Sequence, residues 1–350
     1  MLNSGMLIMI VRVLSIIFFL GAGVAPQAFA QNINEEETPE ITFDLPIDCT
    51  PGDNCFVQNY VDTDPNRRWR DYMCRGLTYD RHKGTDFRIF SMKEMEAGVD
   101  VLAAADGRVK GLRKSEEDGL FINGNTQATE GKECGNGIII AHDDGWETQY
   151  CHLKKNSIRV SRGQKVTAGT PIASVGLSGA TEFSHLHFEV RHNSNTIDPF
   201  TGATTLEGCN VSALSHWTIA ARAFLNYIPT GVLNQGIATS IPDNMAIESG
   251  QHSELEFETN APMLIYYVRI FGLHPDDVQE LILTDPQGVE LAQSSEAHQG
   301  ARKAQFFSYV GKERPEGEWP EGTYTAQYKL IRNGKILLQR DLGFTVGDVF

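Results

Sequence analysis

Two histidines separated by a single residue stand in a segment that alternates polar and apolar residues from Ser184 to Val190. This alternation is typical of a half-buried strand, and it predicts that His185, His187 and Glu189 share the face opposite the core. Imidazoles one strand repeat apart lie roughly 6–7 Å from each other. Both could therefore reach one small metal or catalytic site, although a pair of this kind more often marks only a polar strand face.

A second group of candidate ligands lies upstream in the segment His82-Lys83-Gly84-Thr85-Asp86. Imidazole and carboxylate groups both bind zinc, at about 2.0–2.2 Å. The intervening glycine would let the backbone turn so that a loop histidine and a strand aspartate converge. Taken alone, a histidine and an aspartate at this spacing favour ordinary surface polarity.

A third candidate is His152, in the segment Tyr150-Cys151-His152-Leu153. If this segment is a strand, its alternation places Tyr150 and His152 on one face and Cys151 and Leu153 on the other. We therefore expect His152 on the polar face and Cys151 in the core or in a disulfide. A thiol nucleophile at Cys151 is the weaker alternative.

Together, these segments resemble the signature of the lysostaphin-type (LytM-like) zinc endopeptidases. The matching order is His-x-Gly-x-Asp, then Tyr-x-His-Leu, then His-Leu-His-Phe-Glu, with further similar blocks at 104–109, 135–138 and 176–179. The resemblance covers about residues 79–199. It implies one zinc ion per chain with water at a fourth, open position. It also implies the ligands His82, Asp86 and His187, and two catalytic histidines, His152 and His185, that activate the water and stabilise the tetrahedral intermediate.

The chemistry of such a site agrees with these residue types. Zinc lowers the pKa of bound water towards about 7 and polarises a carbonyl, and a nearby imidazole can move a proton near neutral pH. The chain has no H-E-x-x-H segment, which excludes the helical metalloprotease class. Tyr79 could donate to an oxyanion but is expected to pack, and Glu189 is expected to be solvated or to support the site. The remaining histidines are predicted to be ordinary surface or core residues: His142, His192, His216, His252, His274 and His298.

The composition limits the possible partners. The 350 residues carry a formal net charge of -15, which argues against a sequence-independent grip on nucleic acid or anionic lipid. Residues 1–30 are predicted to be a signal peptide, because Arg12 precedes an apolar run and Ala28-Phe29-Ala30 has the form of a cleavage site. The alternative is an uncleaved anchor. No later stretch is long and apolar enough to span a bilayer, so we expect an exported protein, periplasmic or extracellular.

Six cysteines in an exported chain suggest disulfides. Cys49 and Cys55 flank a turn-rich segment, and Cys134 and Cys151 lie at nearly equal distances from a turn near Asp143-Asp144-Gly145. These two pairings are favoured, with Cys74 and Cys209 as the remainder, but six cysteines allow 15 pairings and the sequence does not choose securely among them.

The predicted fold is mainly β, in two domains. Residues 31–48 read as a flexible leader, and 49–228 as an antiparallel-sheet LytM-like peptidase domain that ends in a short helix within 213–227. Residues 229–245 read as a linker. Residues 246–350, with several short strands and turns, suggest an immunoglobulin-like β-sandwich. Strands in the first domain are expected at 85–90, 100–103, 107–112, 137–142, 147–153 and 171–175. In the second they are expected at 254–258, 263–271, 278–283, 304–310, 322–331 and 335–344.

The resemblance implies an activity: zinc-dependent hydrolysis of a peptide bond in the stem peptides or cross-links of peptidoglycan. Two alternatives stay open: a non-hydrolytic, wall-binding activator of other cell-wall hydrolases, and a secreted protease acting on proteins. We expect the substrate groove to run along the sheet face that holds the zinc. The leader or the polar loop at 115–132 could cover this groove. The sequence does not fix the oligomeric state.

Overall fold

The computed structural model describes residues 39–120, 130–209, 214–301 and 303–347. The predicted signal peptide lies outside these residues. Within the part of the chain that is described, no helix has the length and apolar character needed to cross a membrane. The chain from Thr38 onward forms one compact unit.

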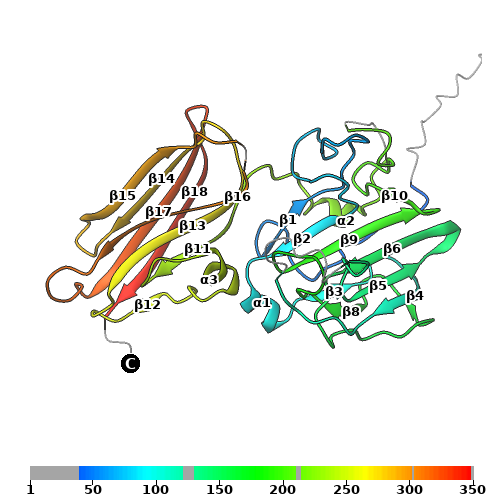
Figure 1. The fold of residues 1–350 in the computed structure, drawn as a ribbon, viewed down its shortest axis with the longest axis horizontal. Coiled ribbons are helices and arrows are strands. Elements are labelled where there is room, and N and C mark those ends of the chain that lie inside the picture. Colours follow the sequence, from blue (N-terminus) through cyan, green and yellow to red (C-terminus); the bar gives the residue numbers. More distant parts are fainter. Residues whose placement is uncertain (1–38, 121–129, 210–213, 302, 348–350) are drawn as a thin grey trace, which may run out of the picture. The chain divides into compact units, whose positions relative to one another are not determined.

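The candidate site lies on an eight-stranded antiparallel sheet (Figure 1). Its strand order is β1-β2-β9-β6-β5-β4-β7, and β10 pairs with β9. The strands are β1 (Cys55–Asn59), β2 (Thr85–Ile89), β4 (Gly107–Arg113), β5 (Gly137–Ala141), β6 (Trp146–Cys151), β7 (Lys165–Val166), β9 (His185–His192) and β10 (Asn195–Ile197). A separate pair joins β3 (Asp100–Leu102) to β8 (Pro171–Ser174). The short helices are α1 (Met92–Ala97) and α2 (Ile219–Arg222), and a 3₁₀ turn, η2 (Asp143–Gly145), links β5 to β6.

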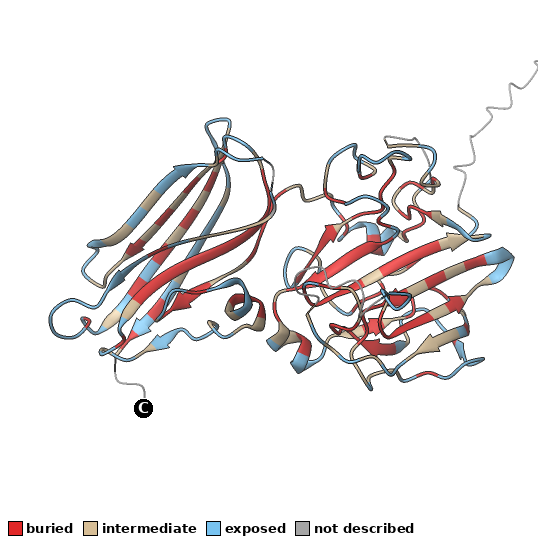
Figure 2. Cartoon of the chain, in the orientation of Figure 1, coloured by how far each residue is buried: buried red, intermediate tan, exposed pale blue. Residues whose placement is uncertain are grey.

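Hydrophobic alternation determines which face of this sheet is buried. Leu186, Phe188 and Val190 on β9 are almost fully buried, as the period-2 pattern predicts, and they belong to the apolar core on that side. Burial alternates in the same way along β6 (Figure 2). The opposite face of β9 is therefore free to carry polar side chains.

The C-terminal region is a sandwich of two sheets around a second core. One sheet has the order β11 (Gly231–Ala238), β13 (Met263–Leu273), β16 (Lys303–Glu313). The other has the order β12 (Glu256–Phe257), β18 (Lys335–Val346), β17 (Gly322–Arg332), β14 (Val278–Thr284), β15 (Glu290–Ala297). Helix α3 (Asn244–Ser249) lies between β11 and β12 in the chain. The mainly β, antiparallel prediction is confirmed.

Three segments differ from the sequence-based expectation. Residues 231–238, predicted as part of a linker, form β11 and pair with β13 along its length. Residues 39–48, predicted as part of a flexible leader, pack on the first domain: Phe43 and Ile47 are buried, and the Phe43 N–H donates to the His216 carbonyl at 2.7 Å. The predicted helix within 213–227 is one turn long, because only α2 is helical among residues 214–227.

The two favoured disulfides and the remaining pair are present. Cys49 bonds to Cys55, Cys74 to Cys209 and Cys134 to Cys151. The turn predicted between Cys134 and Cys151 is η2, where Asp144 and Gly145 both adopt positive φ. This left-handed conformation matches the twist of a tight hairpin, so the local sequence explains how Cys134 and Cys151 meet.

Candidate functional site

Three potential metal ligands meet beside the two central strands. Asp86 on β2 pairs in register with His187 on β9, and His82 comes from the loop before β2. The Oδ1 of Asp86 lies 2.8 Å from His187 Nδ1 and 3.1 Å from His82 Nε2, and the two nitrogens are 3.1 Å apart. Tetrahedral zinc separates its ligand atoms by roughly 3.3–3.6 Å. A triangle of two imidazole nitrogens and one carboxylate oxygen therefore fits a zinc ion after a small expansion.

The groups behind this triangle orient its ligands. The Nδ1–H of His82 donates to the Tyr60 carbonyl at 2.7 Å, which leaves the Nε2 lone pair facing Asp86. The second oxygen of Asp86 accepts from the Asn59 side chain at 3.0 Å. Such outer contacts hold metal ligands in place. Burial acts to raise the pKa of Asp86, but the facing imidazoles outweigh it and hold that pKa well below its usual range.

Gly84 makes room for His187. A Cβ at this position would lie 2.6 Å from His187 Cε1 and Nε2, and 2.8 Å from the Phe188 carbonyl oxygen. The left-handed residue of this loop is Arg81, with φ 64°, and Gly84 does not have a positive φ. The chain bends at Gly84, as expected from the sequence, and the absence of a side chain there also allows the close approach of the imidazole.

His152 reaches the site by a different route from the one its sequence predicts. Tyr150 faces the core, where it is fully buried against Phe188, and Cys151 pairs in register with His187. Simple alternation would then turn His152 into the core. Strand β6 ends at Cys151, however, and His152 has a φ of 59°, which breaks the alternation and returns its side chain to the site. The predicted face of Tyr150 is therefore wrong, while the His152 ring still lies beside the rings of His185 and His187.

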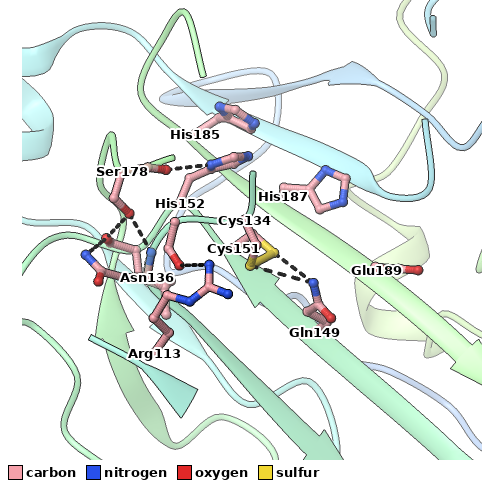
Figure 3. The surroundings of a disulfide bond; sticks show 12 residues. Arg113, Cys134, Asn136, Gln149, Cys151, His152, Ser178, His185, His187 and Glu189 are labelled. Atoms are coloured by element: carbon pink, nitrogen blue, oxygen red, sulfur yellow. Dashed lines mark hydrogen bonds between the residues drawn. A yellow bond between two sulfur atoms is a disulfide. The ribbon is translucent and has the colours of Figure 1, made fainter. Parts of the chain in front are cut away.

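His152 and His185 are tethered in the same way. The Nδ1–H of His152 donates to the Ser178 carbonyl at 2.8 Å, and that of His185 donates to the Phe183 carbonyl at 2.9 Å. Each ring therefore keeps a basic Nε2. The two rings are 4.6 Å apart between centroids, and His185 Nε2 lies 3.5 Å from Asp86 Oδ1. Figure 3 shows His152, His185 and His187 gathered beside the Cys134–Cys151 disulfide.

Burial keeps these two imidazoles neutral. It lowers the pKa of His152 well below its usual value, with further lowering from His185 and His187. Burial also lowers the pKa of His185, although Asp86 acts in the opposite direction. A neutral imidazole can accept a proton at neutral pH, so both rings are suited to proton transfer.

Several residues that the motifs did not single out hold His152 in position. The Asn136 side chain donates to the Leu153 carbonyl at 3.1 Å, and the Ser178 hydroxyl donates to the same oxygen at 2.8 Å. The His152 N–H donates to the Cys134 carbonyl at 2.8 Å. Asn136 and Ser178 fall within the blocks at 135–138 and 176–179 that carried the resemblance, so the signal was present but had no role attached to it.

The remaining candidates lie outside the ligand triangle. Among the described residues, the one cluster able to hold a metal consists of His82, Asp86 and His187. Glu189 is buried and accepts from Arg191 at 3.3 Å and Thr196 at 3.2 Å. Tyr79 is half exposed, with its ring 4.4 Å from that of His82. His142, His192, His216, His252, His274 and His298 are not part of the cluster.

Part of the chain is similar to proteins of a known family. Residues 80–199 match the family model of Peptidase family M23. The resemblance to the lysostaphin-type family is therefore confirmed for this segment. Peptidoglycan DD-endopeptidase ShyB of Vibrio cholerae is 32% identical over 117 residues, which are 33% of this chain and 22% of that protein. Murein hydrolase activator NlpD of Escherichia coli is 35% identical over 102 residues, covering 29% of this chain and 22% of that protein.

A solved zinc-containing peptidase from Vibrio cholerae is 25% identical to this chain, with a TM-score of 0.27. The match covers 40% of this chain and 39% of the solved chain. The chain spans about one fifth of the length of the two curated relatives. The family match ends at residue 199, so it leaves the C-terminal sandwich unassigned.

Proposed function

We propose that this M23 domain is a zinc-dependent endopeptidase that hydrolyses peptide bonds in the stem peptides or cross-links of peptidoglycan. The observation that carries the proposal is the ligand triangle of His82, Asp86 and His187 with two tethered, neutral imidazoles beside it. The resemblance to the lysostaphin-type family implies these ligand and catalytic roles for the same five residues.

The hydrogen bonds of the five side chains distinguish the metal ligands from the residues that transfer protons. His82, Asp86 and His187 would hold one zinc ion, which when bound polarises the scissile carbonyl and acidifies a water molecule. His152 and His185 accept and return protons at Nε2, because each Nδ1–H is committed to a backbone carbonyl. Asp86 keeps its negative charge, which favours a bound cation.

Peptidoglycan is the favoured substrate because one relative is named as a peptidoglycan endopeptidase. Another is named as a hydrolase activator, and that function is the second candidate. All five predicted site positions carry histidine or aspartate in this chain, which favours hydrolysis over activation. Export to the periplasm or the exterior, as the segment 1–30 predicts, would bring the enzyme to this substrate.

The test measures zinc content and digestion of purified sacculi for the wild type and His185→Ala. We expect one zinc per chain in both proteins and release of cut peptides by the wild type alone. Casein in place of sacculi separates wall hydrolysis from general proteolysis. Bound zinc without digestion of sacculi by the wild type would refute the peptidoglycan endopeptidase and favour the activator, and an absence of zinc would refute the metal site.

A further inference from the structure

A buried charge cluster joins β2 of the peptidase domain to the C-terminal region. Arg88, two residues after Asp86, donates from Nη2 to Glu248 Oε2 at 2.6 Å, and Arg269 of β13 donates from Nη1 to the same oxygen at 2.7 Å. Glu248 lies in α3. All three side chains are almost fully buried. One carboxylate therefore balances two guanidinium groups away from water, where an unpaired charge is strongly disfavoured.

Two further contacts join the same regions of the chain. The rings of Phe56 on β1 and Phe271 on β13 are 5.6 Å apart, and Phe271 belongs to the apolar core of the peptidase domain. The Asn234 side chain of β11 donates to the Phe90 carbonyl at 3.2 Å. These contacts join β11 and β13 to the peptidase domain, and the carboxylate of Glu248 is the counter-charge that Arg88 and Arg269 share.

Arg88 connects Glu248 to His185 through the Phe183 ring. Its guanidinium carbon lies 4.2 Å from the centre of the Phe183 ring, and Gln58 accepts from its Nη1 at 2.7 Å. The Phe183 ring in turn lies 4.6 Å from the His185 ring, and the Phe183 carbonyl accepts the His185 Nδ1–H. Arg88 also pairs in register with His185 across β2 and β9. An unbroken series of contacts thus runs from Glu248 through Arg88 and Phe183 to His185.

We propose that Glu248 and Arg88 are positioning residues for hydrolysis, because they fix Phe183 and thereby the orientation of the His185 ring. The C-terminal region would then contribute to catalysis through α3, in addition to any role as a spacer or wall-binding module. This inference rests on the proposed peptidase function. It predicts that a change at Glu248 affects proton transfer by His185 and leaves the ligand triangle intact, since none of His82, Asp86 and His187 touches the cluster.

The experiment compares Glu248→Gln with a matched control, Asp277→Asn. Asp277 is also a buried carboxylate paired with an arginine, Arg332, at 2.7 Å, but it lies within the sandwich and makes no contact with this series. We expect Glu248→Gln to lower kcat roughly 10- to 100-fold with unchanged KM and zinc content, as misplacement of a catalytic group does. Asp277→Asn should keep wild-type kcat. Arg88→Met is a second variant, with the same expected loss, in case Glu248→Gln does not fold.

Two readouts separate positioning from a general loss of structure. The residual rate of His185→Ala is measured in incubations longer than the digest in which the wild type alone releases peptides. In this background Glu248→Gln should lower the residual rate no further, because its effect passes through the missing ring. The Nδ1–H of His185, identified by its absence in His185→Ala, should give a slowly exchanging proton NMR signal in the wild type and Asp277→Asn. That signal should be lost in Glu248→Gln.

The inference is overturned if Glu248→Gln and Asp277→Asn have equal rates, if Glu248→Gln slows the His185→Ala protein by the same factor, or if the proton signal persists. An inactive wild type that shows the expected changes in the proton signal would overturn the peptidase proposal alone.

Discussion

The replacement Gly84→Ala tests whether the space that Gly84 leaves open determines metal binding. The added Cβ would lie 2.6 Å from two atoms of the His187 ring, whereas carbon atoms pack at about 3.5–4.0 Å. The ring must therefore move by roughly 1 Å. Zinc sites tolerate distance errors of about 0.2 Å, so we expect zinc affinity to fall roughly 10- to 100-fold, as it does when the support of a ligand is lost.

The assay is competition with a chromogenic chelator on the metal-free protein, followed by a thermal melt. The Phe188 carbonyl also lies 2.8 Å from the added Cβ, so overpacking should cost about 1–3 kcal/mol of folding stability. Gly111→Ala is the matched control, because a Cβ there meets nothing within 4 Å and the residue does not have a positive φ. A folded Gly84→Ala protein that binds zinc as tightly as Gly111→Ala would refute the argument that Gly84 is needed for the approach of His187.

Three further predictions concern other parts of the domain. His152→Asn should keep the zinc and the melting temperature, because Asn tolerates the left-handed backbone. It should lower the rate of hydrolysis roughly 100- to 10,000-fold, because the general base is lost. Wild-type activity of this variant would contradict the role of His152. Replacing both Cys134 and Cys151 with serine should cost roughly 3 kcal/mol of stability and should also slow hydrolysis, because the Cys134 carbonyl holds the His152 N–H; an unchanged rate in the folded variant would refute the second part. Burial raises the pKa of Asp198 from 3.8 to about 7, so the folded chain retains a proton that the unfolded chain releases, and stability falls as the pH rises between these values. Asp198→Asn should therefore gain stability relative to the wild type by at most about 3 kcal/mol between about pH 5 and about pH 8, and urea unfolding showing an equal difference at both values would contradict the shifted pKa.

Local sequence was sufficient to predict the structure of segments whose residue pattern is compatible with one backbone conformation. The alternation at 184–190 predicts both the buried and the polar face of β9, and the turn at 143–145 predicts the bond between Cys134 and Cys151. In these segments the hydrophobic period and the turn chemistry favour the same structure. The ligand and catalytic roles assigned to the five site residues remain predictions until metal binding and activity are measured.

Local sequence failed where tertiary contacts or a single dihedral angle decide the outcome. The Tyr-x-His-Leu segment reads as a strand, and nothing in it indicates that His152 adopts a positive φ. Residues 39–48 are predicted as part of a polar leader, although their apolar residues Ile41, Phe43, Leu45 and Ile47 alternate along the chain. Phe43 packs against Phe188 and forms a backbone bridge with Trp217, and both partners lie far away in the sequence. Strand β15 went unpredicted because it is mostly exposed and polar, so pairing with β14 creates it where hydrophobic alternation is weak.

The two faces of the central sheet also explain why the C-terminal region could affect catalysis without affecting the metal. Apolar contacts such as those of Phe43 and Phe188 lie on the core face, and they stabilise the sheet regardless of what its polar face carries. Arg88 is a charged residue placed on β2 in register with His185, and its counter-charge, Glu248, comes from α3. Removing Glu248 would leave two buried guanidinium groups unbalanced, and one of them, that of Arg88, lies over the Phe183 ring beside His185. The ligand triangle has its own supports in Tyr60 and Asn59 and would be unaffected.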